Sequence, residues 1–160
     1  MSGAKALGYC GAPPEPGGVW RTGDLGYVDR DGFLYLTGRK RDIFVTSFGR
    51  NVAPEWVEAE LTAAPEIAHA WVWGESRPWS AAVLAAAPGQ RPGDVSRAVE
   101  RANRVLPDYA RIRAWIAAER DFSFTGGELT SNGRLRRDIL LQQYGSRLDR
   151  LYQEVHDFVL

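Results

Sequence analysis

The tetrapeptide Asp29-Arg30-Asp31-Gly32 limits the structures that the first part of this chain can form. It separates two short apolar runs, and its glycine stands where a tight turn needs a positive φ. Short apolar runs joined by such a turn are typical of a β-hairpin. We therefore predict paired strands at Leu25–Val28 and Phe33–Thr37.

Signals for strands and for helices alternate along the rest of the chain. Apolar runs bounded by Gly, Pro or charged residues predict strands at 43–46, 67–73, 81–87 and 112–117. Pro54 predicts the start of a helix with Glu55 and Glu58 near its positive end, and Asp94 is the predicted N-cap of a second helix. Two closing helices are expected at 135–144 and 146–159. This order predicts an α+β domain in which a short β-sheet is flanked by helices.

Composition excludes several classes of protein. Lys and Arg number 20 and Asp and Glu also number 20, so the overall charge predicts neither a nucleic acid nor an anionic membrane as partner. No apolar run approaches the ~18 residues of a membrane helix, and the amino terminus shows no signal-peptide pattern. The single cysteine, Cys10, cannot form an intrachain disulfide, and we expect a cytoplasmic protein. His69 and His156 are too few for a metal site, so none is predicted.

Three segments carry polar residues in a defined pattern. The first is Trp20-Arg21-Thr22-Gly23-Asp24-Leu25-Gly26, the second runs from 37 to 42 and continues from 47 to 58, and the third is Leu129–Arg137. In order and spacing they resemble the acyl-adenylate-forming (AMP-binding) enzymes, in the acyl-CoA synthetase branch of that family. The resemblance covers roughly residues 7–144 and implies only the C-terminal portion of such an enzyme.

The resemblance implies a division of the chain into three parts. Residues 1–40 would be the end of a large N-terminal domain, consisting of a loop and the hairpin. Residues 41–145 would be the mobile C-terminal α+β domain, and 146–160 an amphipathic tail helix. The family's ATP-gripping loop, rich in Ser, Thr and Gly, has no counterpart here. We therefore expect a natural fragment, a split-gene subunit or an excised piece, inactive alone.

The resemblance also assigns site residues. Asp24 would accept hydrogen bonds from the ribose hydroxyls of the adenylate, because an ionised carboxylate can bind two neighbouring hydroxyls. Arg39 would reach the ribose or a phosphate, and Arg41 would be the hinge about which the small domain rotates, although most relatives carry Asp or Lys there. Gly49 would border the CoA tunnel, where a glycine lets the backbone approach a ligand. Without the family, Asp24 would be an ordinary turn residue and 39–41 a solvated basic turn.

Arg134 stands where the family has a catalytic lysine, which bridges the carboxylate oxygen and the α-phosphate during adenylation. No lysine follows Lys40 that could replace it. Arginine keeps the positive charge, but its guanidinium is bulkier, planar and always protonated, so the exchange is not conservative. Two interpretations are open. The intact Asn132-Gly133 turn and Arg137 favour a branch that works with arginine, and the other is a domain whose adenylation function has decayed.

The function implied by the resemblance is that of an ATP-dependent ligase, which converts a carboxylic acid to an acyl-AMP and then to an acyl-CoA thioester in fatty acid metabolism. Its cofactors would be ATP or AMP and Mg, bound mainly by the N-terminal domain, together with CoA. Its partners would be that domain, or a split subunit carrying it, and the carboxylic acid and CoA substrates. The alternative is a non-catalytic interaction module derived from the same fold.

Two features have both a packing and a binding interpretation. The six tryptophans could stack bases of a single-stranded nucleic acid, but Trp71 and Trp73 alternate in an apolar strand, which favours core packing. The tail helix could pack on its own domain or on another protein through the apolar face that carries Leu148, Leu151, Tyr152, Val155 and Val159.

Overall fold

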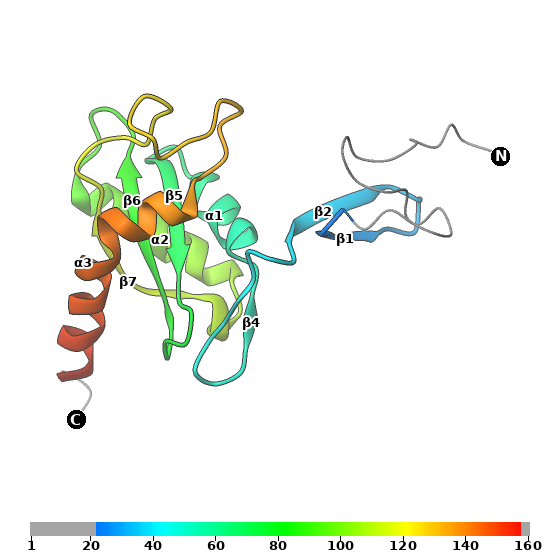
Figure 1. Ribbon diagram of the computed structural model, residues 1–160, viewed down its shortest axis with the longest axis horizontal. Coiled ribbons are helices and arrows are strands. Elements are labelled where there is room, and N and C mark those ends of the chain that lie inside the picture. Colours follow the sequence, from blue (N-terminus) through cyan, green and yellow to red (C-terminus); the bar gives the residue numbers. More distant parts are fainter. Residues whose placement is uncertain (1–21, 158–160) are drawn as a thin grey trace, which may run out of the picture.

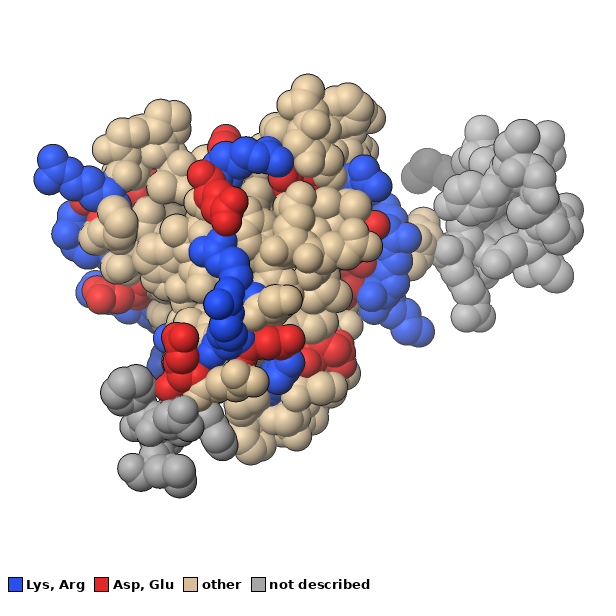
Figure 2. Space-filling model, turned by 60° about the vertical axis from the view of Figure 1, so that its left-hand side comes forward, with Lys and Arg blue, Asp and Glu red and all other residues tan. Residues whose placement is uncertain are grey.

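The computed structural model describes residues 22–157, with side chains through 154. The Gly- and Pro-rich start, Cys10, Trp20, Arg21 and the side chains of Val155, His156 and Val159 lie outside this description. Within it, no helix is long and apolar enough to cross a membrane. Figure 2 shows basic and acidic side chains interspersed on the face in view, in keeping with the balanced total charge.

The predicted hairpin is confirmed. Strands β1 (Asp24–Val28) and β2 (Leu34–Arg39) pair antiparallel, with Asp24 opposite Arg39. The Asp29 side chain accepts the backbone N–H of Asp31 and that of Phe33, at 3.0 and 2.9 Å, and Gly32 has a φ of 88°. The hairpin stands apart from the main sheet (Figure 1). Its apolar residues are largely exposed, namely Tyr27, Val28, Phe33, Leu34, Tyr35 and Leu36.

The domain core is a three-stranded sheet between two layers of helix (Figure 1). Strand β6 (Ser80–Ala86) lies in the centre, antiparallel to β5 (Ile67–Trp73) and parallel to β7 (Ile112–Ala117). Helices α1 (Pro54–Thr62) and α2 (Pro92–Val105) cover one face, and α3 (Arg137–Asp157) covers the other. A two-residue ladder of β3 (Phe44–Val45) and β4 (Asn51–Val52) and a 3-10 turn at Asp108–Ala110 complete the described elements. The predicted α+β class is confirmed.

The alternation of side chains along β5 builds both cores. Ala70 and Val72 face α1 and α2, whereas Trp71 and Trp73 face α3. Trp71 is 1% exposed, so it is a core residue. The packing interpretation of these two tryptophans is therefore confirmed.

The two closing helices predicted at 135–144 and 146–159 are one helix, α3, which continues through Gly145. The buried residues Leu140, Tyr144, Leu148 and Tyr152 recur every four positions and form one continuous face against the sheet. The cost of a helical glycine is only about 1 kcal/mol, which this burial exceeds. Burial of Leu148 and Tyr152 also shows that the described part of the tail packs on its own domain.

The predicted N-cap of α2 is wrong by one turn. Arg91 is the N-cap, and Asp94 lies inside the helix, where its carboxylate accepts the Arg91 backbone N–H at 2.9 Å. Pro92 begins the helix because its fixed φ suits the first helical position. A carboxylate can accept hydrogen bonds from the free backbone N–H groups at a helix start both from the N-cap and from within the first turn. The sequence alone therefore does not distinguish these two positions for Asp94.

Candidate functional site

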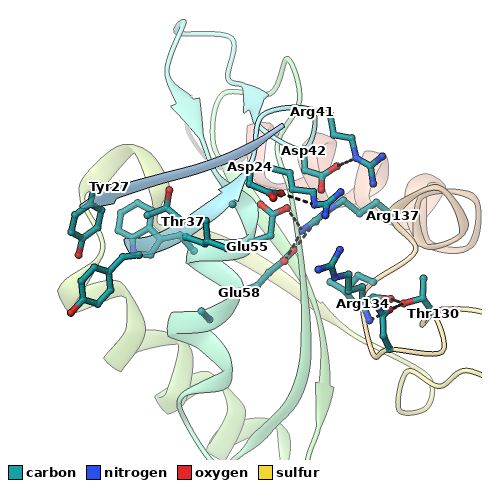
Figure 3. A pocket seen from close by; sticks show the side chains of 18 residues that line it. Asp24, Tyr27, Thr37, Arg41, Asp42, Glu55, Glu58, Thr130, Arg134 and Arg137 are labelled. Atoms are coloured by element: carbon teal, nitrogen blue, oxygen red, sulfur yellow. Dashed lines mark hydrogen bonds and ion pairs between the residues drawn. The ribbon is translucent and has the colours of Figure 1, made fainter. Parts of the chain in front are cut away.

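A pocket of about 750 Å³ lies between the hairpin and the helical domain (Figure 3). Its walls come from the hairpin, from the turn that follows β2, from α1 and from the segment that leads into α3. Among the predicted site residues, Asp24, Arg39, Arg41 and Arg134 all line it, whereas Gly49 does not. The fold thus brings segments that are about 100 residues apart in the sequence together around one cavity.

Asp24 and Arg39 form an ion pair across the hairpin. They are opposite each other in the β1–β2 ladder, and Arg39 Nε lies 3.2 Å from Asp24 Oδ1. Both side chains are about one third exposed, at 27% and 34%. Within residues 22–157, the second carboxylate oxygen of Asp24 accepts no hydrogen bond. The pair therefore holds both groups at the wall while leaving acceptor and donor capacity for a polar ligand.

The predicted hinge is a tight turn between β2 and β3. The Lys40 N–H donates to the Gly23 carbonyl at 2.8 Å and the Asp42 N–H to the Arg39 carbonyl at 3.1 Å. Arg41 is 77% exposed, and its one ion pair within the described residues joins Nε to Asp42 Oδ1 at 3.5 Å. Few side-chain contacts therefore oppose a change of backbone angle at this position.

Arg134 is carried by a turn that its own hydrogen bonds close. Thr130 supplies most of them, since its backbone N–H donates to the Arg134 carbonyl at 2.8 Å and its hydroxyl oxygen accepts the Arg134 N–H at 3.0 Å. Gly133, with a φ of 77°, donates to the Thr130 carbonyl at 2.9 Å. The Arg134 guanidinium faces the pocket (Figure 3) and forms no ion pair among the described residues. The other three arginines of this pocket each have a carboxylate partner, so among the described arginines of this wall Arg134 is the one whose charge is left for an anion.

A buried ion pair beside Arg134 was missed by the sequence reasoning. Glu58 was expected only as an acidic residue near a helix start, yet both of its carboxylate oxygens bind Arg137, at 2.8 and 2.7 Å. Glu58 Oε1 also accepts the Val72 N–H at 2.9 Å. These partners lie 79 and 14 residues away. The only signal in the sequence is the Arg137 position in the third motif.

Glu55 is the second unexpected group in the pocket. Burial raises the pKa of its carboxyl to about 7, helped by the nearby Asp42 carboxylate, to which the protonated acid can donate, and the Arg137 guanidinium opposes this rise. Its Oε2 is buried, with no hydrogen-bond donor among the described residues. A carboxyl group that can take up a proton near neutrality therefore lies between α1 and the hinge turn.

Gly49 lies in the β3–β4 turn, outside the pocket. Its N–H donates to the Thr46 carbonyl at 2.9 Å, and its φ of 73° favours glycine. A side chain built there would meet no atom within 4 Å, so the surface around it is open. Its predicted place beside the CoA tunnel stays a prediction.

The charged side chains of this pocket suit an anion better than a metal ion. Among residues 22–157, no group of three or more His, Cys, Asp or Glu side chains could hold a metal. The Asp24 and Glu58 carboxylates that line the pocket are paired with arginines, so they do not make a Mg site. Arg134 and Arg39 can instead bind phosphate or carboxylate oxygens. His69 lies elsewhere and pairs with Asp121.

Comparison with known proteins identifies the same architecture. The family profile described as the AMP-binding enzyme C-terminal domain matches residues 41–156. Long-chain-fatty-acid–CoA ligase FadD15 of Mycobacterium tuberculosis is 33% identical, in an alignment that covers 86% of this chain and 27% of the relative. Human long-chain-fatty-acid–CoA ligase ACSBG1 is 31% identical, with 91% and 26% covered. This chain thus spans about a quarter of the length of these curated relatives.

Solved structures agree on the fold. One is the A-PCP didomain of the carboxylic acid reductase from Segniliparus rugosus, in complex with AMP. It superposes with a TM-score of 0.77 at 24% identity, and the match covers 90% of this chain and 22% of the reductase chain. The amide bond synthetase McbA from Marinactinospora thermotolerans has a TM-score of 0.66 at 28% identity, with 81% and 26% covered.

Proposed function

This chain belongs to the AMP-binding enzymes, whose C-terminal domain it contains, and on that premise we propose that it serves a ligase that activates a carboxylic acid with ATP. In the first step a carboxylate oxygen would attack the α-phosphorus of ATP, giving acyl-AMP and pyrophosphate. In the second, a thiol would attack the acyl carbon and AMP would leave. The observation that carries the proposal is that Asp24, Arg39 and Arg134 all line one pocket.

The proposed roles follow from the charges of these side chains. The Asp24 carboxylate accepts hydrogen bonds from the ribose hydroxyls, with Arg39 beside it to bind the ribose or phosphate. The Arg134 guanidinium stabilises the negative charge that develops on the α-phosphate as the carboxylate attacks, which is the largest contribution such a residue can make. Arg41 is the hinge that separates the two half-reactions in space, and Gly49 borders the thiol path after rotation. Mg and the triphosphate would be held mainly by the N-terminal domain.

CoA is the thiol we propose as acceptor. The support is that FadD15 and ACSBG1 are both named as CoA ligases. A place in fatty acid metabolism and a cytoplasmic location belong to the same proposal. The exposed apolar side chains of the hairpin support an N-terminal domain as partner, in the same chain or as a separate subunit, because such a patch marks a contact surface.

The test uses the protein in which this chain is combined with its adenylation domain. Acid-dependent release of pyrophosphate from ATP, measured with a panel of fatty and aromatic acids, should exceed a no-acid control, and acyl-CoA should form when CoA is added. Pyrophosphate release without any thioester would overturn CoA as acceptor. Absence of both products would favour the alternative, a non-catalytic interaction module. The observation that supports this alternative is Arg134, which stands where the family has a lysine.

A further inference from the structure

The ion pair between Glu58 and Arg137 joins the Arg134 turn to the rest of the domain. Arg137 is the first residue of α3 and follows Arg134 by three positions. Its two terminal nitrogens donate to the two oxygens of Glu58, so the contact is bidentate and fixes direction as well as distance. The Glu58 side chain is 10% exposed, so water competes little for these bonds.

Glu58 is itself held from two sides. It lies in α1, and its Oε1 accepts the N–H of Val72 in the sheet, at 2.9 Å. One carboxylate therefore links α1, strand β5 and the start of α3. Between Arg134 and Arg137, the chain is also held by the Leu129–Leu135 bridge and by the Arg136 N–H, which donates to the Glu128 carbonyl at 2.7 Å.

The pair also determines which cation is free. Arg137 and Arg134 both line the pocket. Glu58 neutralises Arg137, and Glu55 Oε1 lies 3.8 Å from the same guanidinium. Arg134 has no such partner among the described residues. A salt bridge in this place contributes geometry more than stability, since an apolar pair of similar size is often as stable.

We propose that Glu58 and Arg137 are positioning residues, which hold the Arg134 turn on α1 so that the turn and the hinge-side helix move as one rigid body. The proposal deepens, and for its catalytic consequence rests on, the proposed function of Arg134. Neither residue needs to touch the nucleotide. Their effect is to place the Arg134 guanidinium at one position in the pocket.

The first test needs only the isolated chain. The Gly133 and Arg134 amides report on the turn, because both donate to Thr130. In Glu58→Gln, hydrogen exchange at these two amides should accelerate about tenfold or more. Glu66→Gln is the matched control, since it breaks an ion pair with Arg101 away from the turn. If Glu58→Gln unfolds, Glu58→Gln/Arg137→Gln removes both charges while keeping an acceptor for Val72. Unchanged exchange in a folded variant would overturn the proposal.

The second test separates positioning from the function of Arg134. In the enzyme completed with its adenylation domain, Glu58→Gln should slow acyl-AMP formation by about 10- to 100-fold. Thioester formation from supplied acyl-AMP should change less than about threefold. Equal losses in both steps would refute a positioning role. Faster exchange in Glu58→Gln combined with full activity of Arg134→Ala would instead refute the function proposed for Arg134 while leaving the rigid attachment of the turn intact.

Discussion

Replacing Glu55 with glutamine should make the folded chain more resistant to unfolding above neutral pH. The Glu55 side chain is 32% exposed, and burial together with the neighbouring Asp42 carboxylate raises its pKa to about 7. Two ionised carboxylates cannot donate to each other, whereas a proton on either one supplies the missing hydrogen bond. The folded state therefore favours the protonated pair.

The sign and size of the effect follow from linkage. The ordinary pKa of this side chain is 4.5, so between about pH 4.5 and 7 the folded state binds more protons than the unfolded state. Stability is full below this interval and falls as pH rises through it, by up to about 3 kcal/mol. Water around a partly exposed carboxyl screens the effect, and we expect about 1–2 kcal/mol. Glutamine has the shape of the protonated acid and does not titrate, so this loss should be absent from Glu55→Gln.

Urea unfolding at pH 5 and pH 8 measures the effect, with fluorescence of the buried Trp71 among the reporters. The parent should lose about 1–2 kcal/mol more between the two pH values than Glu55→Gln. Glu60→Gln, on the same helix, is the control and should behave like the parent. Equal losses in the parent and in Glu55→Gln would show that the carboxyl pair does not hold a proton in the folded state.

Three further predictions concern catalysis, binding and packing. In the complete enzyme, Arg134→Ala should slow adenylation by two or more orders of magnitude, about 3 kcal/mol, with a smaller effect on thioester formation, whereas Arg134→Lys should retain adenylation. Pyrophosphate release measures the first step, and CoA addition to supplied acyl-AMP measures the second. Equal small losses in both steps would place Arg134 outside the active site. The isolated chain should show no acid-dependent pyrophosphate exchange and should bind AMP no tighter than about millimolar. Micromolar binding by calorimetry would contradict the claim that the nucleotide site needs the N-terminal domain. Leu148→Ala should lower the unfolding free energy by about 2–5 kcal/mol, because Leu148 is 0% exposed. The control Leu141→Ala should lower it much less, because Leu141 is 40% exposed. Similar urea midpoints for the two variants would show that the tail helix is not part of the core.

The secondary structure was predictable where its cause is local. The Asp-Gly turn at 29–32 and the apolar runs that became β5, β6 and β7 depend on neighbours a few residues away, and the structure has them within about one residue of the predicted bounds. The start of α1 at Pro54 was predicted correctly, whereas the N-cap of α2 was not, because a carboxylate can accept the free amides of a helix start from several positions. The predicted break at Gly145 failed because burial of Leu140, Tyr144 and Leu148 outweighs a local preference.

Three motifs indicate the family without any structure, because the residues of each motif are close neighbours along the chain. They also indicate that Asp24, Arg39 and Arg134 are candidates for one site. The pairing of Glu58 with Arg137, 79 residues away, and the approach of Glu55 to Asp42 beside the hinge became visible only in the folded chain. Desolvation and charge pairing depend on distance in space, so a glutamate at a helix start looks the same in the sequence whether it faces water or a buried guanidinium.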